Sequence, residues 1–196
     1  MPIAIVVPTL DKTRGEATAA CAVANAGTDA YPVVSVDHSH EGYTATVNRA
    51  LAQLEGETVC LLVDDCVPSS GWLAELSAAM QARSKFNCWF AGPSGACRTN
   101  PQCNGRPGDK RQPQFVMALA GFCLLIHRDA LIMLHGLDRR YQHYASDIDL
   151  QFRGRQYYGA RSLWVPGVYV AHELHAPLEP WWTHDHETLR NIWRKQ

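Results

Sequence analysis

Continuous apolar runs alternate in the first part of the chain with segments whose apolar residues recur at helical spacing. Ile3–Val7 and Val59–Val63 are uninterrupted apolar runs, and Val33–Val36 is a shorter apolar run that includes Ser35. Such runs predict strands that are buried on both faces, as in parallel sheets. Helices are predicted between and after them, over Thr13–Ala26, Tyr43–Leu54 and Trp72–Arg83. The alternation predicts an α/β fold with a mixed, mainly parallel sheet flanked by helices.

The second half is less regular. Gly92–Pro113 is rich in Gly, Pro and polar residues, and it is too long for an ordinary connection, which indicates a functional or mobile loop. Four elements are predicted after it: an apolar run, a short helix, a polar helix and a strand pair broken by Pro166 and Gly167, over Phe115–Ile126, His127–Leu134, Gln142–Arg155 and Leu163–Val170. Because no internal repeat or linker is evident, we expect one domain over residues 1–196, with 172–196 as a His/Trp-rich C-terminal tail.

Composition removes several classes of protein. The net charge of −1 over 196 residues selects neither nucleic acid nor a membrane surface. No apolar run approaches the ~20 residues of a transmembrane helix, and Met1–Leu10 lacks the basic flank of a signal peptide, so we expect a cytoplasmic protein. Seven cysteines without a Cys-x-x-Cys pair argue against a disulfide framework or a zinc ribbon, although Cys97 and Cys103 flank a loop and could pair.

Carboxylates follow two of the predicted strands. Asp64 and Asp65 come directly after Val59–Val63, and Asp37 follows Val33–Val36. Adjacent carboxylates are costly at such a place unless they are solvated, paired or bound to a cation. Hard divalent ions prefer oxygen ligands and often bridge to phosphates, and α/β sheets bind ligands at the carboxyl ends of their strands. A metal site that holds a diphosphate and a solvated turn before Pro68 are both consistent with this pattern.

A second acidic segment and a strand-end histidine complete the candidate chemistry. Asp147 and Asp149 are two residues apart, so on a helix they do not share a face. One could point into a cleft as a general base while the other caps the helix or pairs with Arg153; an ordinary polar helix start is the alternative. His172 ends the last apolar run and is a ligand type for Mn²⁺ or Zn²⁺, or else a polar surface residue.

Two further segments have open interpretations. The long loop carries four cations opposed only by Asp109, namely Arg98, Arg106, Lys110 and Arg111. A solvated loop is favoured over a contact with a diphosphate or an acceptor, and a nucleic-acid acceptor is the least favoured. The tail carries Trp181 and Trp182 among four histidines, His172, His175, His184 and His186. Packing of the tryptophans on the domain is favoured first, a cover over a nucleotide second and structural zinc last.

Taken in order, these segments resemble the family 2 glycosyltransferases, especially their rhamnosyltransferase-like branch, over roughly residues 3 to 175. The matching segments are the first strand Ile3–Thr9, Gly42–Leu51, the DxD-like Asp64–Pro68 with Gly71–Leu73, Gly121–Leu124, Gly136–Asp138, the helix start Ser146–Arg153 and Pro166–His172. Each motif is weak alone, whereas the ordered set is specific.

The resemblance implies a GT-A fold and a metal-dependent, inverting transfer of a sugar from a nucleoside-diphosphate sugar, most often a UDP-sugar, to an acceptor hydroxyl. It implies that Asp65 and His172 hold Mn²⁺ or Mg²⁺ and that Asp147 is the catalytic base. It also places four residues near the donor nucleotide: Thr9, Asp37, Asn48 and Asp64. The acceptor and the oligomeric state, monomer or dimer, stay open.

Two positions depart from the family pattern. Val63 occupies the first position of the DxD-like element, and Ser146 stands where the family usually has Glu. The rival hypotheses are a nucleotidyltransferase on a similar sheet and an inactive nucleotide- or sugar-binding domain. The first would require a basic, Gly-rich loop after the first strand, of which Pro8–Gly15 is a faint version.

Overall fold

A computed structural model of the chain describes residues 2–54, 58–97, 101–173 and 178–194. It contains one mixed sheet with strand order β2-β1-β3-β7-β5-β8-β4, and β6 pairs with β8. The strands are β1 (Ile3–Thr9), β2 (Ala30–Val36), β3 (Val59–Leu62), β4 (Cys66–Pro68), β5 (Cys88–Ser94), β6 (Gln114–Val116), β7 (Cys123–Ile126) and β8 (Arg161–His172).

The sheet combines a parallel half with an antiparallel centre. β1 lies between β2 and β3 and is parallel to both, and β5 is parallel to β8. β7 runs antiparallel to both β3 and β5, and β4 and β6 pair antiparallel with β8. The predicted α/β class, a mixed sheet flanked by helices, is therefore confirmed.

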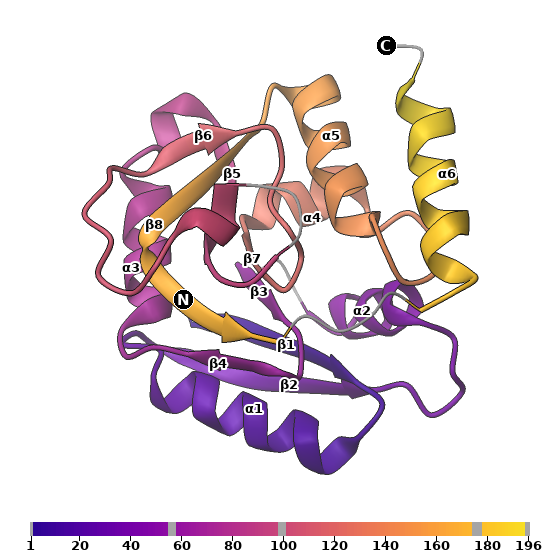
Figure 1. The fold of residues 1–196 in the computed structure, drawn as a ribbon, viewed down its shortest axis with the longest axis horizontal. Helices are drawn as coiled ribbons and strands as arrows, with labels where there is room; N and C mark the ends of the chain where they lie inside the picture. Colours follow the sequence, from indigo (N-terminus) through magenta and orange to yellow (C-terminus); the bar gives the residue numbers. More distant parts are fainter. Residues whose placement is uncertain (1, 55–57, 98–100, 174–177, 195–196) are drawn as a thin grey trace.

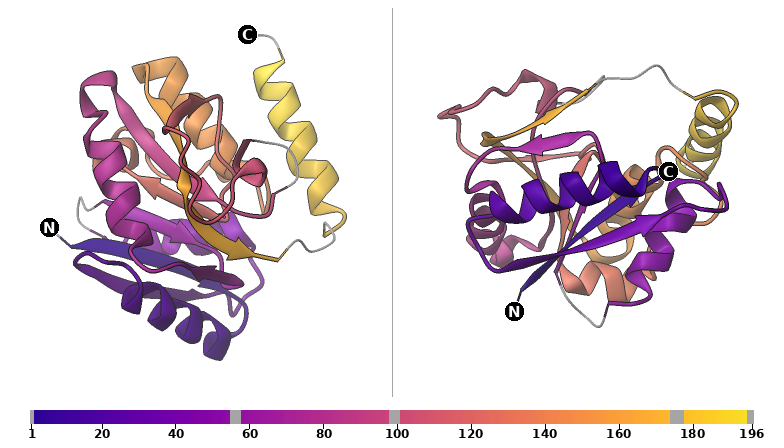
Figure 2. Two further views of the ribbon diagram at one scale, coloured as in Figure 1. Left: turned by 60° about the vertical axis from the view of Figure 1, so that its left-hand side comes forward. Right: turned by 90° about the horizontal axis from the view of Figure 1, so that it is seen from below.

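Helices cover both faces of this sheet (Figures 1 and 2). They are α1 (Lys12–Ala24), α2 (Tyr43–Leu51), α3 (Trp72–Gln81), α4 (Arg128–Leu134), α5 (Ser146–Tyr158) and α6 (Trp181–Trp193), with 3-10 turns at Ser84–Phe86 and Pro101–Asn104. α1 and α3 pack on one face, and α2, α4 and α5 on the other. α6 lies beside α5 at one end of the molecule (Figure 1).

The residues of β1 explain why both faces are covered. Ile3, Ile5 and Val7 contribute to the core under α1 and α3, whereas Ala4 and Val6 contribute to the core under α2, α4 and α5. Because neighbouring side chains of a strand point to opposite faces, an uninterrupted apolar run requires a partner layer on each side. The apolar run that predicts the strand thus also predicts the two helical layers.

Most predicted elements occur within a few residues of their predicted bounds, but three differ. The apolar run predicted over Phe115–Ile126 forms two separate strands, β6 and β7. The helix predicted over Gln142–Arg155 begins only at Ser146, because Ala145 has a left-handed backbone (φ 59°) and the preceding amides bond to Asp185. The predicted strand pair over Leu163–Val170 is one strand, β8, whose pairing with β5 shifts register around Pro166.

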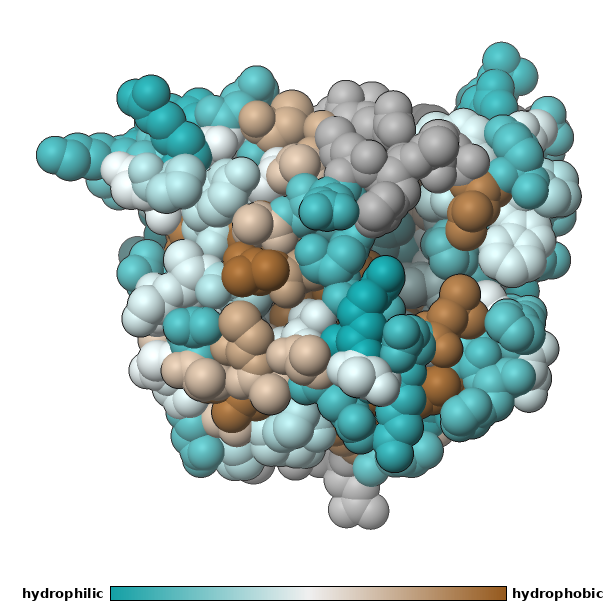
Figure 3. All heavy atoms as spheres, turned by 60° about the horizontal axis from the view of Figure 1, so that its bottom comes forward, coloured by the Kyte–Doolittle hydropathy of each residue, from teal (hydrophilic) through white to brown (hydrophobic). Residues whose placement is uncertain are grey.

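The surface and the helix lengths add two facts. Figure 3 shows hydrophobic residues as small separate groups among hydrophilic ones on the face it presents. Within the described parts of the chain, no helix is long and apolar enough to span a membrane.

Candidate active site at the carboxyl ends of the strands

The register of the sheet brings the predicted strand-end residues to one edge. Thr9 pairs with Val36 across β1 and β2, so Asp37 follows directly beside it, and the Asp37 amide donates to the Thr9 carbonyl at 2.8 Å. β3 runs parallel on the other side of β1 and ends just before Asp64. Antiparallel pairing of β4 with β8 sets Cys66 opposite His172. Residues from five strands therefore meet at one edge of the sheet.

Asp64 is held by the first strand and the first helix. The Thr9 hydroxyl lies 2.5 Å from Asp64 Oδ2, and Arg14 Nη2 lies 2.5 Å from Asp64 Oδ1. The Thr18 hydroxyl donates to the Asp64 carbonyl at 2.7 Å. The Asp64 carboxylate raises the pKa of Arg14 through this bond. Sequence reasoning missed Arg14, although the basic cluster Lys12–Arg14 directly after the first strand was a signal for it.

Asp65, next along the chain, has a carboxylate oxygen that faces His172. His172 Nε2 lies 3.6 Å from Asp65 Oδ1, and the two side chains are 18% and 14% exposed. His172 Nδ1 lies 2.8 Å from the Ala96 carbonyl, an acceptor, so Nδ1 donates this bond and Nε2 is the nitrogen that faces Asp65. The imidazole also stacks on Phe122, with ring centroids 5.0 Å apart and planes at 6°. The ring is thus fixed in both orientation and tautomer.

The Asp65–His172 pair fits a divalent cation by its donor chemistry. A distance of 3.6 Å is too long for a hydrogen bond but falls within the span of two ligands that each lie about 2.1 Å from one ion. A carboxylate with an imidazole whose other nitrogen bonds to a carbonyl is a common ligand set for Mn²⁺ or Zn²⁺. Within the described residues, no cluster of three or more His, Cys, Asp or Glu is suited to a metal.

Asp147 lies on the first turn of α5 with its carboxylate against Gly121. A Cβ on Gly121 would sit 2.7 Å from Asp147 Oδ2 and 2.9 Å from its Cγ, so only glycine leaves room for this side chain. Burial raises the pKa of Asp147 above its ordinary value; the backbone amides of Ile148, Asp147 and Gly121, and the nearby His186, act in the opposite direction. A half-buried carboxylate with a raised pKa is suited to general-base work.

The dipeptide Gly121–Phe122 links the candidate base to the candidate metal ligands. Gly121 contacts Asp147, and the adjacent Phe122 ring stacks on His172. The Phe122 carbonyl accepts the Val63 amide at 3.0 Å, which ties the dipeptide to the strand end that carries Asp64 and Asp65. One short segment therefore touches both parts of the candidate site.

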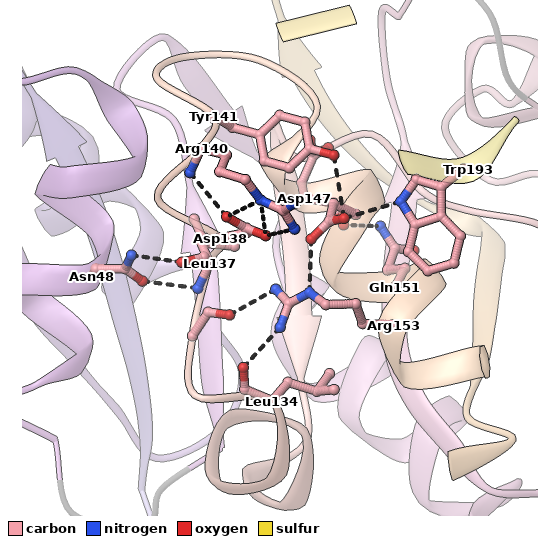
Figure 4. Close-up of polar contacts among 12 residues, drawn as sticks. Asn48, Leu134, Leu137, Asp138, Arg140, Tyr141, Asp147, Gln151, Arg153 and Trp193 are labelled. Atoms are coloured by element: carbon pink, nitrogen blue, oxygen red, sulfur yellow. Dashed lines mark hydrogen bonds and ion pairs between the residues drawn. The ribbon is translucent and has the colours of Figure 1, made fainter. Parts of the chain in front are cut away.

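Two residues that were predicted to contact the nucleotide, Asp37 and Asn48, form hydrogen bonds within the protein. Asp37 accepts the amides of Glu41 and Gly42 at 2.9 and 2.8 Å, which fixes the loop that leads into α2. Asn48 donates to the Leu137 carbonyl at 2.8 Å and accepts the Leu137 amide at 2.9 Å (Figure 4). The structure therefore brings Thr9, Asp37 and Asp64 together, whereas the Asn48 amide is engaged by the Gly136–Leu137 turn.

Asp149, in the first turn of α5, belongs to a buried polar network whose members Tyr141, Arg153 and Trp193 are labelled in Figure 4. It is fully buried, and it accepts Arg153 Nε at 2.7 Å, Trp193 Nε1 at 3.0 Å and the Tyr141 hydroxyl at 3.2 Å. Of the two alternatives for the acidic segment, Asp149 is thus the residue that pairs with Arg153. The Asp147 carboxylate lies instead against Gly121.

Arg111 of the basic loop is engaged in internal contacts. Arg111 pairs with Asp109, lowering the pKa of Asp109 to about 2, and stacks over Trp164 at 4.8 Å. This loop borders a hollow of about 520 Å³ lined by Arg106, Gly108, Asp109, Lys110 and Arg111; Arg98 lies outside the described residues.

The tail folds into a helix that the sequence analysis did not predict. On α6, Trp181 contacts the His143 ring and Trp182 the Tyr144 ring, with centroids 5.4 and 5.1 Å apart. The tryptophans therefore pack on the domain. His175 lies outside the described residues. Among the described residues, His172, His184 and His186 form no metal-binding cluster with other His, Cys, Asp or Glu side chains.

Solved structures share this architecture. The chain matches GalNAc-T7, crystallised with UDP, GalNAc and Mn²⁺, with a TM-score of 0.68 at 16% identity, over 92% of this chain and 44% of that one. It matches S. aureus TarS residues 1–349, in complex with UDP-GlcNAc, with a TM-score of 0.65 at 16% identity, over 98% of this chain and 65% of that one. The fold of this chain is GT-A.

A protein of about the same length as this chain also aligns with it. A197 from STIV aligns with a TM-score of 0.55 at 12% identity, over 89% of this chain and 87% of that one. No protein-family model matches the sequence, and no curated protein matches it. The chain spans less than two thirds of the GalNAc-T7 and TarS chains that it matches, and identities this low establish the fold alone.

Proposed function

We propose that this chain is a divalent-metal-dependent, inverting glycosyltransferase that moves a sugar from a UDP-sugar to an acceptor hydroxyl. The observation that carries the proposal is the arrangement around Gly121–Phe122, which contacts the raised-pKa carboxylate Asp147 on one side and the Asp65–His172 pair on the other. The fold neighbours crystallised with UDP or UDP-GlcNAc, one of them with Mn²⁺, support the choice of donor and metal.

In this proposal the donor diphosphate lies at the carboxyl ends of β1 and β3. Asp65 and His172 would hold Mn²⁺ or Mg²⁺, which when bound neutralises charge on the leaving diphosphate. Arg14 is more than half exposed at the same edge and adds a second positive charge there, while its partner Asp64 fixes its position. Thr9 and Asp37 border the place where the nucleoside would lie.

Asp147 supplies the base. As the acceptor oxygen forms its bond to the anomeric carbon, the bond from that carbon to the diphosphate oxygen breaks, and Asp147 takes the proton of the acceptor hydroxyl. Attack opposite to the leaving group inverts the anomeric configuration. Burial raises the pKa of Asp147, which increases its strength as a base.

The test measures UDP released from UDP-glucose and UDP-GlcNAc with water as acceptor, with Mn²⁺ or with EDTA. Wild type should release UDP only with metal, and Asp147→Asn should lose about 10²–10⁴-fold in rate, the usual contribution of a general base. Glu187→Gln, at an exposed carboxylate on α6, is the control and should retain the rate.

Other outcomes would contradict the proposal. Release of pyrophosphate from UTP with a sugar phosphate would establish a nucleotidyltransferase. Mn²⁺-dependent UDP binding without turnover, in the presence of candidate acceptor sugars, would establish a binding domain.

A further inference from the structure

A buried carboxylate on α6 bonds to the segment directly before the proposed base. Asp185 is fully buried, and its carboxylate accepts the backbone amides of Gln142, His143 and Tyr144. The shortest of these bonds are 2.7 Å, from His143 and Tyr144 to the same oxygen, Oδ2. A carboxylate removed from water is costly unless several donors replace its hydration, and three consecutive amides do so here.

The segment that Asp185 holds is strained at its junction with α5. Ala145 has φ 59° and ψ −6°, a left-handed conformation in which the Cβ of a non-glycine residue lies too close to its own backbone. Such a conformation persists only where the surroundings impose it. Ser146 and then Asp147 follow Ala145 directly, so the backbone direction at Ala145 sets where the first turn of α5 presents the Asp147 carboxylate.

Other contacts fix α6 itself to the same region. The Leu178 amide donates to the Tyr144 hydroxyl at 2.8 Å just before the helix. At its far end Trp193 Nε1 donates to Asp149 Oδ1 at 3.0 Å (Figure 4). The helix is thus attached to the loop before Asp147 and to α5 after it, so that Asp185 is held rigidly relative to both.

We propose that Asp185 is a positioning residue for Asp147: from the C-terminal helix it holds the Gln142–Tyr144 amides and thereby maintains the turn that aims the base at the acceptor hydroxyl. This inference rests on the proposed function. None of the groups proposed to hold the metal and the nucleotide lies on this loop, so loss of Asp185 should impair the transfer step while leaving donor binding intact. A misplacement of about 1 Å at a reacting group can cost 10²-fold in rate.

The experiment compares Asp185→Ala, Asp185→Asn, Asp147→Asn and the control Glu187→Gln in the UDP-release assay with Mn²⁺. It measures kcat and KM for UDP-GlcNAc, the dissociation constant of UDP with Mn²⁺, and hydrogen exchange of the Gln142–Tyr144 amides. Asp185→Ala should lower kcat about 10–100-fold, with KM and the UDP dissociation constant within about threefold of wild type. Its Gln142–Tyr144 amides should exchange faster, while those of β1 and β3 stay protected.

Asp185→Asn is the conservative variant. Its side-chain oxygen can still accept the three amides that Oδ2 accepts, so it should recover most of the kcat that Asp185→Ala loses. Should Asp185→Ala fail to fold, Asp185→Asn carries the test alone, because its neutral oxygen accepts these amides more weakly than the carboxylate. Faster exchange of the Gln142–Tyr144 amides together with a lower kcat would support the inference, whereas faster exchange with an unchanged kcat, or a lower kcat with unchanged exchange, would overturn it.

Three results would overturn the inference. One is an unchanged kcat in folded Asp185→Ala; the second is an equal loss of UDP binding and kcat, which marks a merely structural residue. The third is wild-type Gln142–Tyr144 amides that exchange as fast as those of open loops. Failure of the proposed function itself is separate, because Asp147→Asn would then retain full turnover or wild type would have none.

Discussion

Gly121→Ala tests how tightly the proposed base is held. The added Cβ would lie 2.7 Å from Asp147 Oδ2 and 2.9 Å from its Cβ and Cγ. Carbon atoms prefer 3.5–4.0 Å, so the Asp147 side chain must move by roughly 1 Å. Overpacking of this kind costs about 1–3 kcal/mol of stability, and a displacement of that size at a catalytic group can cost 10²-fold in rate.

The assay is UDP release from UDP-GlcNAc, combined with the melting temperature of each variant. Gly154→Ala is the matched control: it makes the same substitution on the helix that carries Asp147, with a 3.0 Å contact to the Phe90 ring. Gly154→Ala should change the melting temperature without changing kcat, whereas Gly121→Ala should lose about 10²-fold in kcat. A folded Gly121→Ala enzyme with kcat within twofold of wild type would refute the assignment of Asp147 as a base held against Gly121.

Three further variants test individual residues. Asn48→Ala removes two hydrogen bonds to Leu137, worth about 1 kcal/mol each, and should lower the melting temperature by about 4–8 °C; a loss of UDP affinity instead would return Asn48 to the nucleotide site. Tyr43→Phe removes a buried hydroxyl that has no hydrogen-bond partner among the described residues, so it should raise the free energy of unfolding, measured by urea titration, by about 1–3 kcal/mol. A lower free energy of unfolding would show that the hydroxyl is bonded. Asp147→Asn should have a higher melting temperature than wild type at pH 7 but not at pH 3. The pKa of Asp147 is raised in the folded protein, so wild type loses stability as the pH rises through that pKa. An equal difference in melting temperature at both pH values would contradict the raised pKa.

The sequence predicts the parts of the fold whose signals are local. The apolar run Ile3–Val7 and the helical spacing of Trp72–Arg83 correspond to β1 and α3 within two residues at each end. The sequence also identifies Asp65 and His172 as candidate metal ligands, because each lies at the end of an apolar run. The family resemblance then assigns both residues to one metal site. The contact between them depends on the antiparallel pairing of β4 with β8, which only the folded sheet provides.

The parts that the sequence does not predict depend on tertiary contacts. Gln142–Ala145 has a helical pattern, but Asp185, more than forty residues away, captures its amides and prevents the helix from starting there. The helix signal of α6 is weak in the sequence because the segment is rich in His and Trp. The position of α6 depends on packing of its tryptophans against Tyr144 and Phe152. Likewise the sequence places the basic residues Lys12 and Arg14 after the first strand, but only the folded structure brings Arg14 to Asp64.

The central claim is that Asp65 and His172 hold a divalent ion that binds the donor diphosphate. The most direct measurement is the melting temperature with UDP, with and without Mn²⁺, for wild type, Asp65→Ala, His172→Ala and the control Glu187→Gln. UDP at 100 times its dissociation constant adds about 2.7 kcal/mol, or about 5–10 °C for a chain of this length. This shift should occur in wild type and in the control, only with Mn²⁺, and should be lost in both site variants. A shift that needs no metal, or that persists in Asp65→Ala and His172→Ala, would contradict it.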